Sequence, residues 1–454
     1  MKSRFPFSLT AGFVASALII FSLPAAAWSN HALGTWQALS NLLAPGRVAA
    51  VRVESLTSFL NAEGHALESL LQQEENWARI NVPEYPPRPD NLRFQSSKNT
   101  QQNRLQFLAA LRINPQAKLP LYVQLRPGAD TQGQTLLPWD EVTTLKHSIS
   151  VKNGQFLRVN EGEIIAALDV VASASDEPDY GLDLGLWNNN AQDFGYGFGK
   201  QPFGNPALEY SSQAPFHMGF FHESPIIYKA AGFLRRTYPE YRIHLYQTLS
   251  KHAFNTGHPY WGWRFAGWAL HYVQDLAQPY HTKVLPGVSV VHILWINAID
   301  MAGAHASKKN IITLVSNRHA ALENYQYFRM HAAYLRNDTQ DALLRATRET
   351  LTSTSTSPPY SFSQIRQEIS RQSYALADET DALLEHALPW KYISDPNYVF
   401  GETEPQVNVF KTIANATIEQ QTRMTESTAH LMKNFGIHTR AFIMATITIV
   451  PILK

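Results

Sequence analysis

The stretch from His271 to His281, HYVQDLAQPYH, constrains this chain more than any other feature. His271 and Asp275 are four residues apart, so on an α-helix their side chains lie on one face, one turn apart. Pro279 is unfavourable inside a helix, which predicts that the helix ends or bends before it and that His281 turns back toward the same pocket. The spacing therefore predicts a metal site at the end of a helix.

A second pair with the same spacing lies downstream. His319 and Glu323, in NRHAALENYQYF, also fall on one face of an expected helix. Histidine and carboxylate ligands favour zinc, although ligand type alone does not separate zinc from manganese or iron. The 454-residue chain contains no cysteine, which excludes thiolate ligands and disulfides alike.

The first 27 residues have the pattern of a secretory signal peptide. Lys2 and Arg4 precede an uncharged apolar stretch at about 5–23, and Ala25 to Ala27 provide a small-residue cleavage site. We therefore expect a secreted or periplasmic protein whose mature chain begins at Trp28. Removing the signal takes away two cations and no acid, which changes the formal charge from +1 to −1. No broad basic field then remains to hold nucleic acid.

Apolar residues at three- and four-residue steps predict a mainly α-helical chain. Helices are expected within 30–78 (two), at 101–111, at 161–173, and from about 224 to the end in alternation with loops. The Pro-rich segment 80–154 is expected to be an insertion, with strand-like alternation only around 119–125. The glycine-rich segment 181–204 predicts a loop and 352–363 a linker. We expect a main domain over 28–330, which holds the candidate metal ligands, and a helical extension over 331–454 packed on it.

Two apolar segments raise the question of membrane contact. The thirteen uncharged residues 441–453 are too few to span a bilayer. Segment 284–304 approaches the length of a span, but His292, Asn297 and Asp300 are unfavourable in lipid. It is interpreted either as a buried or lid helix or as an interfacial segment that contacts a membrane, and a true span is disfavoured.

The string H-Y-x-x-D-x-x-Q-P-x-H, the downstream H-x-x-x-E pair and Trp28 together resemble the bacterial zinc-dependent phospholipase C family in its long form, which shares its fold with fungal single-strand nucleases. The resemblance is dense from Asp176 to Glu323, roughly a third of the chain. It implies three zinc ions and hydrolysis of phosphatidylcholine-type lipids at a membrane surface to diacylglycerol and a phosphorylated headgroup. No nucleic acid and no obligate protein partner are expected.

The resemblance also implies, position by position, which residues hold the zinc ions. The first ion would take Asp176, His217, His271 and Asp275, the second His281, His319 and Glu323, and the third His31, a bridging oxygen of Asp275, and the free amine and carbonyl oxygen of Trp28. Asp176 would in addition orient or deprotonate the attacking water.

Neighbouring residues compete for two of these roles. Asp179 and Asp183 lie in the same turn as Asp176, where aspartate also caps the backbone. Asp176 is favoured because it directly follows the expected helix end, as the family's ligand does. His217 is favoured over His222, which is interpreted as a residue that orients a ligand.

Two other functions compete with a phospholipase. A secreted zinc-dependent single-strand nuclease would use the same metals, but Glu323 matches the phospholipase branch and the mature chain has no basic excess. A non-catalytic, membrane-binding helical protein with a structural zinc site is the alternative of another class. The aromatic residues of 181–221 either cover the core or form a wall that receives a quaternary ammonium group by cation–π attraction. No G-x-S-x-G motif points to a serine hydrolase.

Overall fold

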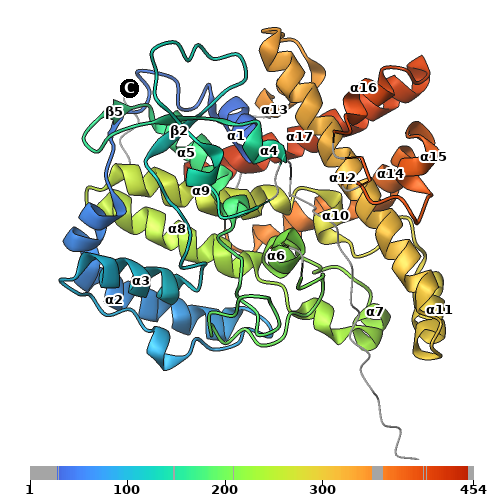
Figure 1. Cartoon of the computed structure of the whole chain (residues 1–454), viewed down its shortest axis with the longest axis horizontal. Helices are drawn as coiled ribbons and strands as arrows, with labels where there is room; N and C mark the ends of the chain where they lie inside the picture. Colours follow the sequence, from blue (N-terminus) through green and yellow to red (C-terminus); the bar gives the residue numbers. More distant parts are fainter. Residues whose placement is uncertain are drawn as a thin grey trace, which may run out of the picture.

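The structure is a computed structural model that describes residues 28, 30–146, 149–207, 209–349, 361–401, 403–404 and 406–447 (Figure 1). The expected signal segment 1–27, most of the expected linker 352–363 and the end of the apolar segment 441–453 lie outside these residues. The described residues 181–204 form no helix or strand, as expected for a loop.

Helices make up most of the described chain, which confirms the prediction of a mainly α-helical protein. The α-helices are α1 (His31–Leu39), α2 (Leu56–Asn81), α3 (Thr100–Leu111), α4 (Ile149–Lys152), α5 (Ala167–Ser175), α6 (Glu209–His217), α7 (Pro225–Ala230), α8 (Pro239–Asn255), α9 (Pro259–Asp275), α10 (Pro279–Thr282), α11 (Val290–Met301), α12 (His305–Leu335), α13 (Ala342–Arg348), α14 (Arg371–Ala387), α15 (Trp390–Ile393), α16 (Val409–Ile413) and α17 (Ile418–Thr446). Short 3-10 or π segments are η1 (Asp90–Leu92), η2 (Trp139–Glu141), η3 (Glu177–Tyr180), η4 (Gly232–Arg235) and η5 (Ile365–Ser370). The helix expected at 101–111 is present as α3 within the expected insertion.

Helix α9 runs through the core, with α8 and α5 packed against it (Figure 1). Its aromatic stripe, formed by Trp261, Phe265, Trp268 and Tyr272, is fully buried, as expected for the face that anchors the helix. The opposite, polar face is buried too, since every residue from Tyr260 to Asp275 is inaccessible. Each polar group on that face therefore requires a partner inside the protein. The candidate site lies on this buried polar face.

Gly267, one turn before His271, lets α5 approach α9 closely. A Cβ atom at this position would lie 2.6 Å from Cβ of Ala174 and 2.7 Å from the carbonyl oxygen of Val171. Gly267→Ala is expected to lower the free energy of unfolding by about 1–3 kcal/mol despite the better helix propensity of alanine, because the backbone of α5 must move. Chemical denaturation measures the change, with Gly232→Ala as the control, since a Cβ atom there meets nothing within 4 Å. Equal stability of the two variants would contradict this close packing.

The described strands form two small antiparallel sheets. β1 (Val51–Arg52) pairs with β5 (Ile164–Ile165), and β4 (Gln155–Arg158) lies between β2 (Tyr122–Leu125) and β3 (Leu136–Leu137). β2 falls within the piece where strand-like alternation was expected. The helix expected at 161–173 is wrong at its start, because Ile164–Ile165 are held extended by β1 and α5 begins only at Ala167.

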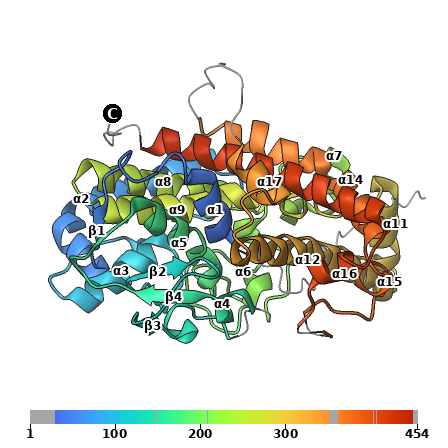
Figure 2. The same ribbon diagram turned by 90° about the horizontal axis from the view of Figure 1, so that it is seen from above.

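The C-terminal helices close over the N-terminal part of the fold. α17 packs against α13, α1 and α9, and α14 packs against α10. Figure 2 shows α17 beside α1. Trp28 and Leu33 share one hydrophobic cluster with Met432 and Phe435 of α17. The expected extension 331–454 thus builds part of the wall around the N-terminal residues.

The apolar segment after His281 forms α11 (Figure 1). In the part of the chain that the structure describes, no helix has both the length and the apolar character needed to cross a bilayer. Only Ile296 and Asp300 of α11 are buried, so α11 is not a buried helix. The interpretations of this segment as a lid helix or an interfacial segment stay predictions.

Candidate metal centre

Side chains from six elements converge near the C-terminal end of α9. As predicted, α9 ends at Asp275, ahead of Pro279, and α10 then carries His281. Three groups of ligand atoms each lie within 4.8 Å of one another, which is close enough to share a metal ion. The groups are His31, His271 and Asp275; Asp179, His217 and His271; and His281, His319 and Glu323. These histidine and carboxylate side chains are thus close enough together to hold metal ions.

The two carboxylate oxygens of Asp275 face different sets of imidazoles. Oδ2 lies 2.9 Å from Nδ1 of His217 and 3.3 Å from Nε2 of His271. Oδ1 lies 3.5 Å from Nε2 of His31 and 3.8 Å from Nδ1 of His281. Asp275 is fully buried, and its Oδ1 has no hydrogen-bond donor among the described residues. One carboxylate therefore stands between two sets of ligands, where it can bridge two cations.

Buried nitrogen atoms without hydrogen-bond partners show that the site suits a cation. Nδ1 of His31 bonds Oε1 of Gln274 at 2.8 Å. Nδ1 of His281 bonds the carbonyl oxygen of His217 at 3.0 Å. Because these oxygens only accept, each Nδ1 must carry a proton. In the neutral ring, which is the form that binds a metal, the lone pair then lies on Nε2. Both Nε2 atoms are buried and lack a hydrogen-bond partner among the described residues, so they are available to a metal such as zinc.

The third group pairs α12 with α10. Nε2 of His319 lies 2.6 Å from Oε1 of Glu323, and Nε2 of His281 lies 3.7 Å from the same oxygen. Gln278 donates its side-chain N–H to that oxygen at 3.0 Å. The ring of Tyr280 stacks on His319 with centroids 5.3 Å apart. α10 thus provides the candidate ligand His281, and Gln278 and Tyr280 contact the other two ligands.

Asp179, rather than Asp176, lies with the histidines of the second group. Its Oδ1 is 3.5 Å from Nε2 of His271 and 3.8 Å from Nδ1 of His217. The structure therefore groups Asp179 with these histidines, and the expectation that Asp176 binds the metal stays a prediction. After α5 ends at Ser175, η3 turns the chain and brings Asp179 back toward α9, a change of direction that residue spacing does not reveal.

Asp176 holds the start of α1 instead. Its Oδ1 accepts a hydrogen bond from the backbone N–H of Ala32 at 3.1 Å, and its Oδ2 accepts one from Nε2 of Gln124 at 2.7 Å. Ala32 follows His31 directly, so this carboxylate positions the segment that carries a candidate ligand.

The structure also separates the two competing histidines. His217 ends α6 and belongs to the second group. His222 belongs to none of the three groups, and its Nε2 bonds the carbonyl oxygen of Arg366 at 3.0 Å. The choice of His217 agrees with this geometry, whereas the expected role of His222 in orienting a ligand does not.

Trp28 lies beside the cluster. Its indole N–H donates to the carbonyl oxygen of Gln274 at 3.1 Å, and its ring packs edge-on against Phe435. The side chain is fully buried. The atoms of Trp28 that were predicted to bind zinc belong to the main chain, and their role stays a prediction.

Burial shifts the pKa values of the candidate ligands, downward for imidazoles and upward for carboxylates. It lowers the pKa of His31 to about 4 and that of His319 to about 3, so both imidazoles are neutral at pH 7. It raises the pKa of Glu323 to about 7. Burial also opposes a charge on His217, but the carboxylates of Asp183 and Asp275 raise its pKa to about 10. A divalent cation would replace these protons and allow neutral imidazoles and ionised carboxylates to coexist.

Two buried residues hold candidate ligands without joining any of the three groups. Nε2 of Gln274 donates to the hydroxyls of Thr35 and Thr439, which leaves its Oε1 facing His31. Gln274 stands within the HYVQDLAQPYH string, but its partner is 243 residues away, so no spacing rule identifies it.

The second of these residues is Asp183. Its Oδ2 lies 3.4 Å from Nε2 of His217, while Nδ1 of that ring faces Asp275. Its Oδ1 accepts a hydrogen bond from Arg242 at 2.5 Å, and Tyr272 donates to Oδ2 at 2.7 Å. Asp183, a competing ligand in the sequence, therefore braces His217 from the side of the ring opposite the cluster.

Asp183→Asn is expected to weaken zinc binding by about 10- to 100-fold. The carboxylate of Asp183 holds the His217 ring in the orientation that directs Nδ1 at the metal, and a neutral amide would hold it less well. Competition with a chromophoric chelator measures the affinity. Glu177→Gln is the matched control, since Glu177 is also buried and ion-paired, but its partners are Arg264 and Trp268. An equal loss in both variants would show a general effect of a broken ion pair and contradict a role for Asp183 at the metal centre.

No protein-family model, no curated protein and no solved structure matches the chain. The candidate metal centre therefore rests on ligand geometry and motif spacing.

Proposed function

We propose that the protein is a secreted or periplasmic zinc-dependent phospholipase C that hydrolyses phosphatidylcholine-type lipids to diacylglycerol and a phosphorylated headgroup. The observation that supports this most strongly is the buried Asp275, whose two oxygens face two sets of imidazoles. A structural zinc site is usually closed by four ligands around one ion and needs no shared carboxylate. Clustered cations with a shared ligand are typical of enzymes that cleave phosphate esters.

We assign the ligands to three zinc ions. The first would be held by Asp179, His217, His271 and Asp275, the second by His281, His319 and Glu323, and the third by His31, Asp275, and the amine and carbonyl oxygen of Trp28. When bound, zinc would neutralise phosphate oxygens, lower the pKa of water and stabilise the leaving alkoxide. The third set requires signal cleavage before Trp28, because an internal amide nitrogen does not bind zinc as a free amine does.

Asp179 is the carboxylate that we place next to the attacking water. Its side chain keeps 15% of its surface exposed, whereas those of His271 and Asp275 are fully buried. Water attacks phosphorus, the bond from phosphorus to the glycerol oxygen breaks, a water proton passes to Asp179, and the glycerol oxygen takes a proton from solvent. Asp176, favoured for this role by the resemblance, has both oxygens engaged in hydrogen bonds.

An apolar groove next to the cluster favours a lipid over a nucleic acid. Among the described residues, the groove is lined by Phe203, Ala214, Met218, Phe220, Tyr280, Val284, Leu285, Ile312, Val315, Ser316 and His319. None of these is Lys or Arg, whereas proteins that track a single strand line its path with cations. Among the aromatic residues of 181–221, Trp187, Phe198 and Phe216 are buried in contact with one another, while Phe203 and Phe220 line the groove. A wall that receives a quaternary ammonium group stays a prediction.

Side-by-side assays on dioleoylphosphatidylcholine and single-stranded DNA test the proposal. We expect the zinc-loaded mature protein to release diacylglycerol and leave DNA intact. A nuclease would give the reverse result, and a protein with a purely structural zinc site would hydrolyse neither. Metal analysis and N-terminal sequencing of the same preparation should give three zinc ions per chain and Trp28 as the first residue.

A further inference from the structure

Helix α11 is apolar on the side that faces solvent. Val290, Val291, Trp295 and Met301, here called the α11 face, are 39, 78, 63 and 67% exposed. The polar residue Asp300 is instead buried. This arrangement differs from that of a normal surface helix, whose solvent-facing side is polar.

A buried ion pair holds α11 in this orientation. Asp300 accepts hydrogen bonds from Nζ of Lys308 and from His305, both at 2.7 Å and both from the first turn of α12. The pair is local, and α11 packs against α12 and α7 at one end of the molecule (Figures 1 and 2). The apolar α11 face is therefore a fixed feature of the fold.

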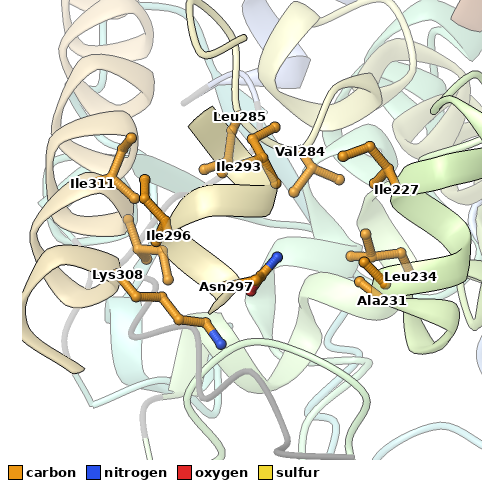
Figure 3. A pocket seen from close by; sticks show the side chains of 12 residues that line it. Ile227, Ala231, Leu234, Val284, Leu285, Ile293, Ile296, Asn297, Lys308 and Ile311 are labelled. Carbon is orange, nitrogen blue, oxygen red and sulfur yellow. The ribbon is translucent and has the colours of Figure 1, made fainter. Parts of the chain in front are cut away.

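The inner side of α11 lines an apolar groove. Figure 3 shows Ile293, Ile296 and Asn297 of α11 between Ile311 of α12 and Ile227 of α7. Val284, Leu285 and Ile312 line this groove and also line the groove that reaches His319. The groove beneath α11 thus adjoins the groove that is lined by the candidate zinc ligand His319.

We propose that the α11 face docks the protein on a phosphatidylcholine bilayer, with α11 lying in the plane of the lipid interface. At 1.5 Å per residue, its twelve residues extend for about 18 Å, which suits an interfacial helix and not a span. Trp295 is the residue type that membrane interfaces favour. We choose a bilayer over a second copy of the chain because the groove beneath α11 adjoins the groove at His319. This choice rests on the proposed function, whereas the exposed α11 face does not.

Paired variants with a common change test the proposal. Val291→Asp and Trp295→Asp add a charge to the α11 face, while Ile80→Asp and Trp390→Asp add one at residues that are similarly exposed, at 82 and 65%, on α2 and α15. Co-sedimentation with sucrose-loaded dioleoylphosphatidylcholine vesicles measures binding of the mature protein without reference to catalysis. We expect each α11 variant to lower the partition coefficient by at least about tenfold and each control to leave it within about twofold.

Hydrolysis then separates this proposal from the proposed function. The rate on vesicles divided by the rate on monomeric dihexanoylphosphatidylcholine should fall in the α11 variants and not in the controls. Vesicle binding that depends on the α11 face without hydrolysis of either lipid would support docking and overturn the phospholipase. Equal binding of vesicles by all four variants would overturn docking on a bilayer. It would also be overturned if the α11 variants lost a concentration-dependent dimer while their binding to vesicles stayed unchanged.

Discussion

Asp275→Asn should lower phospholipid hydrolysis by more than about 100-fold and remove at least one zinc ion per chain. Asparagine has nearly the same shape, but it is neutral and has a single side-chain oxygen. It cannot offer an anionic atom to His217 and His271 on one side and to His31 on the other, as Asp275 does. Losses of 10- to 100-fold are typical when a residue only orients a metal ligand, so the loss of a shared ligand should exceed that range.

Zinc content and the rate on phosphatidylcholine are measured on the same preparation, and circular dichroism shows whether the variant is folded. Asp341→Asn is the control: Asp341 is buried, is ion-paired with Arg329 at 3.0 Å and caps α13, a role that asparagine fills equally well. A folded Asp275→Asn protein with the zinc content and rate of this control would refute the shared ligand.

The ligand pairs within single helices could be predicted from the sequence because their geometry is local. Residues i and i+4 of a helix lie on one face whatever the rest of the chain does, so His271 with Asp275 and His319 with Glu323 needed only a helix around them. The structure supplies that helix in both cases, as α9 and α12. Their approach to each other depends on the turn at Pro279, which the sequence also indicates.

Residues whose position depends on long-range packing could not be predicted in this way. The choice between Asp176 and Asp179 depends on the direction of η3, and the residue that bonds His31 lies 243 positions away from it. The orientation of α11 was equally inaccessible, because a helix that is mostly apolar gives no preference for the side that faces the core. The ion pair of Asp300 with Lys308 decides it.

Removal of zinc should lower the thermal unfolding temperature by at least about 8 °C. An ion that binds only the folded state and is present at about 1,000 times its dissociation constant adds about 4 kcal/mol to the free energy of unfolding. In a large domain each kcal/mol changes the unfolding temperature by roughly 2 °C or more. Without the ion, buried atoms such as Nε2 of His31 and of His281 are left without hydrogen-bond partners among the described residues. Each such atom then costs the desolvation free energy that the metal offsets.

Calorimetry before and after chelation measures this shift, and added zinc should restore the original temperature while magnesium, which prefers oxygen ligands, should not. His319→Ala should reduce the effect of the chelator, because one ligand set is already incomplete. His222→Ala should leave the effect unchanged, since His222 bonds a backbone carbonyl outside the cluster. An unfolding temperature that the chelator leaves unchanged would mean that the buried imidazoles and carboxylates stabilise one another without a cation. That result would refute the metal centre and, with it, the chemistry proposed for it.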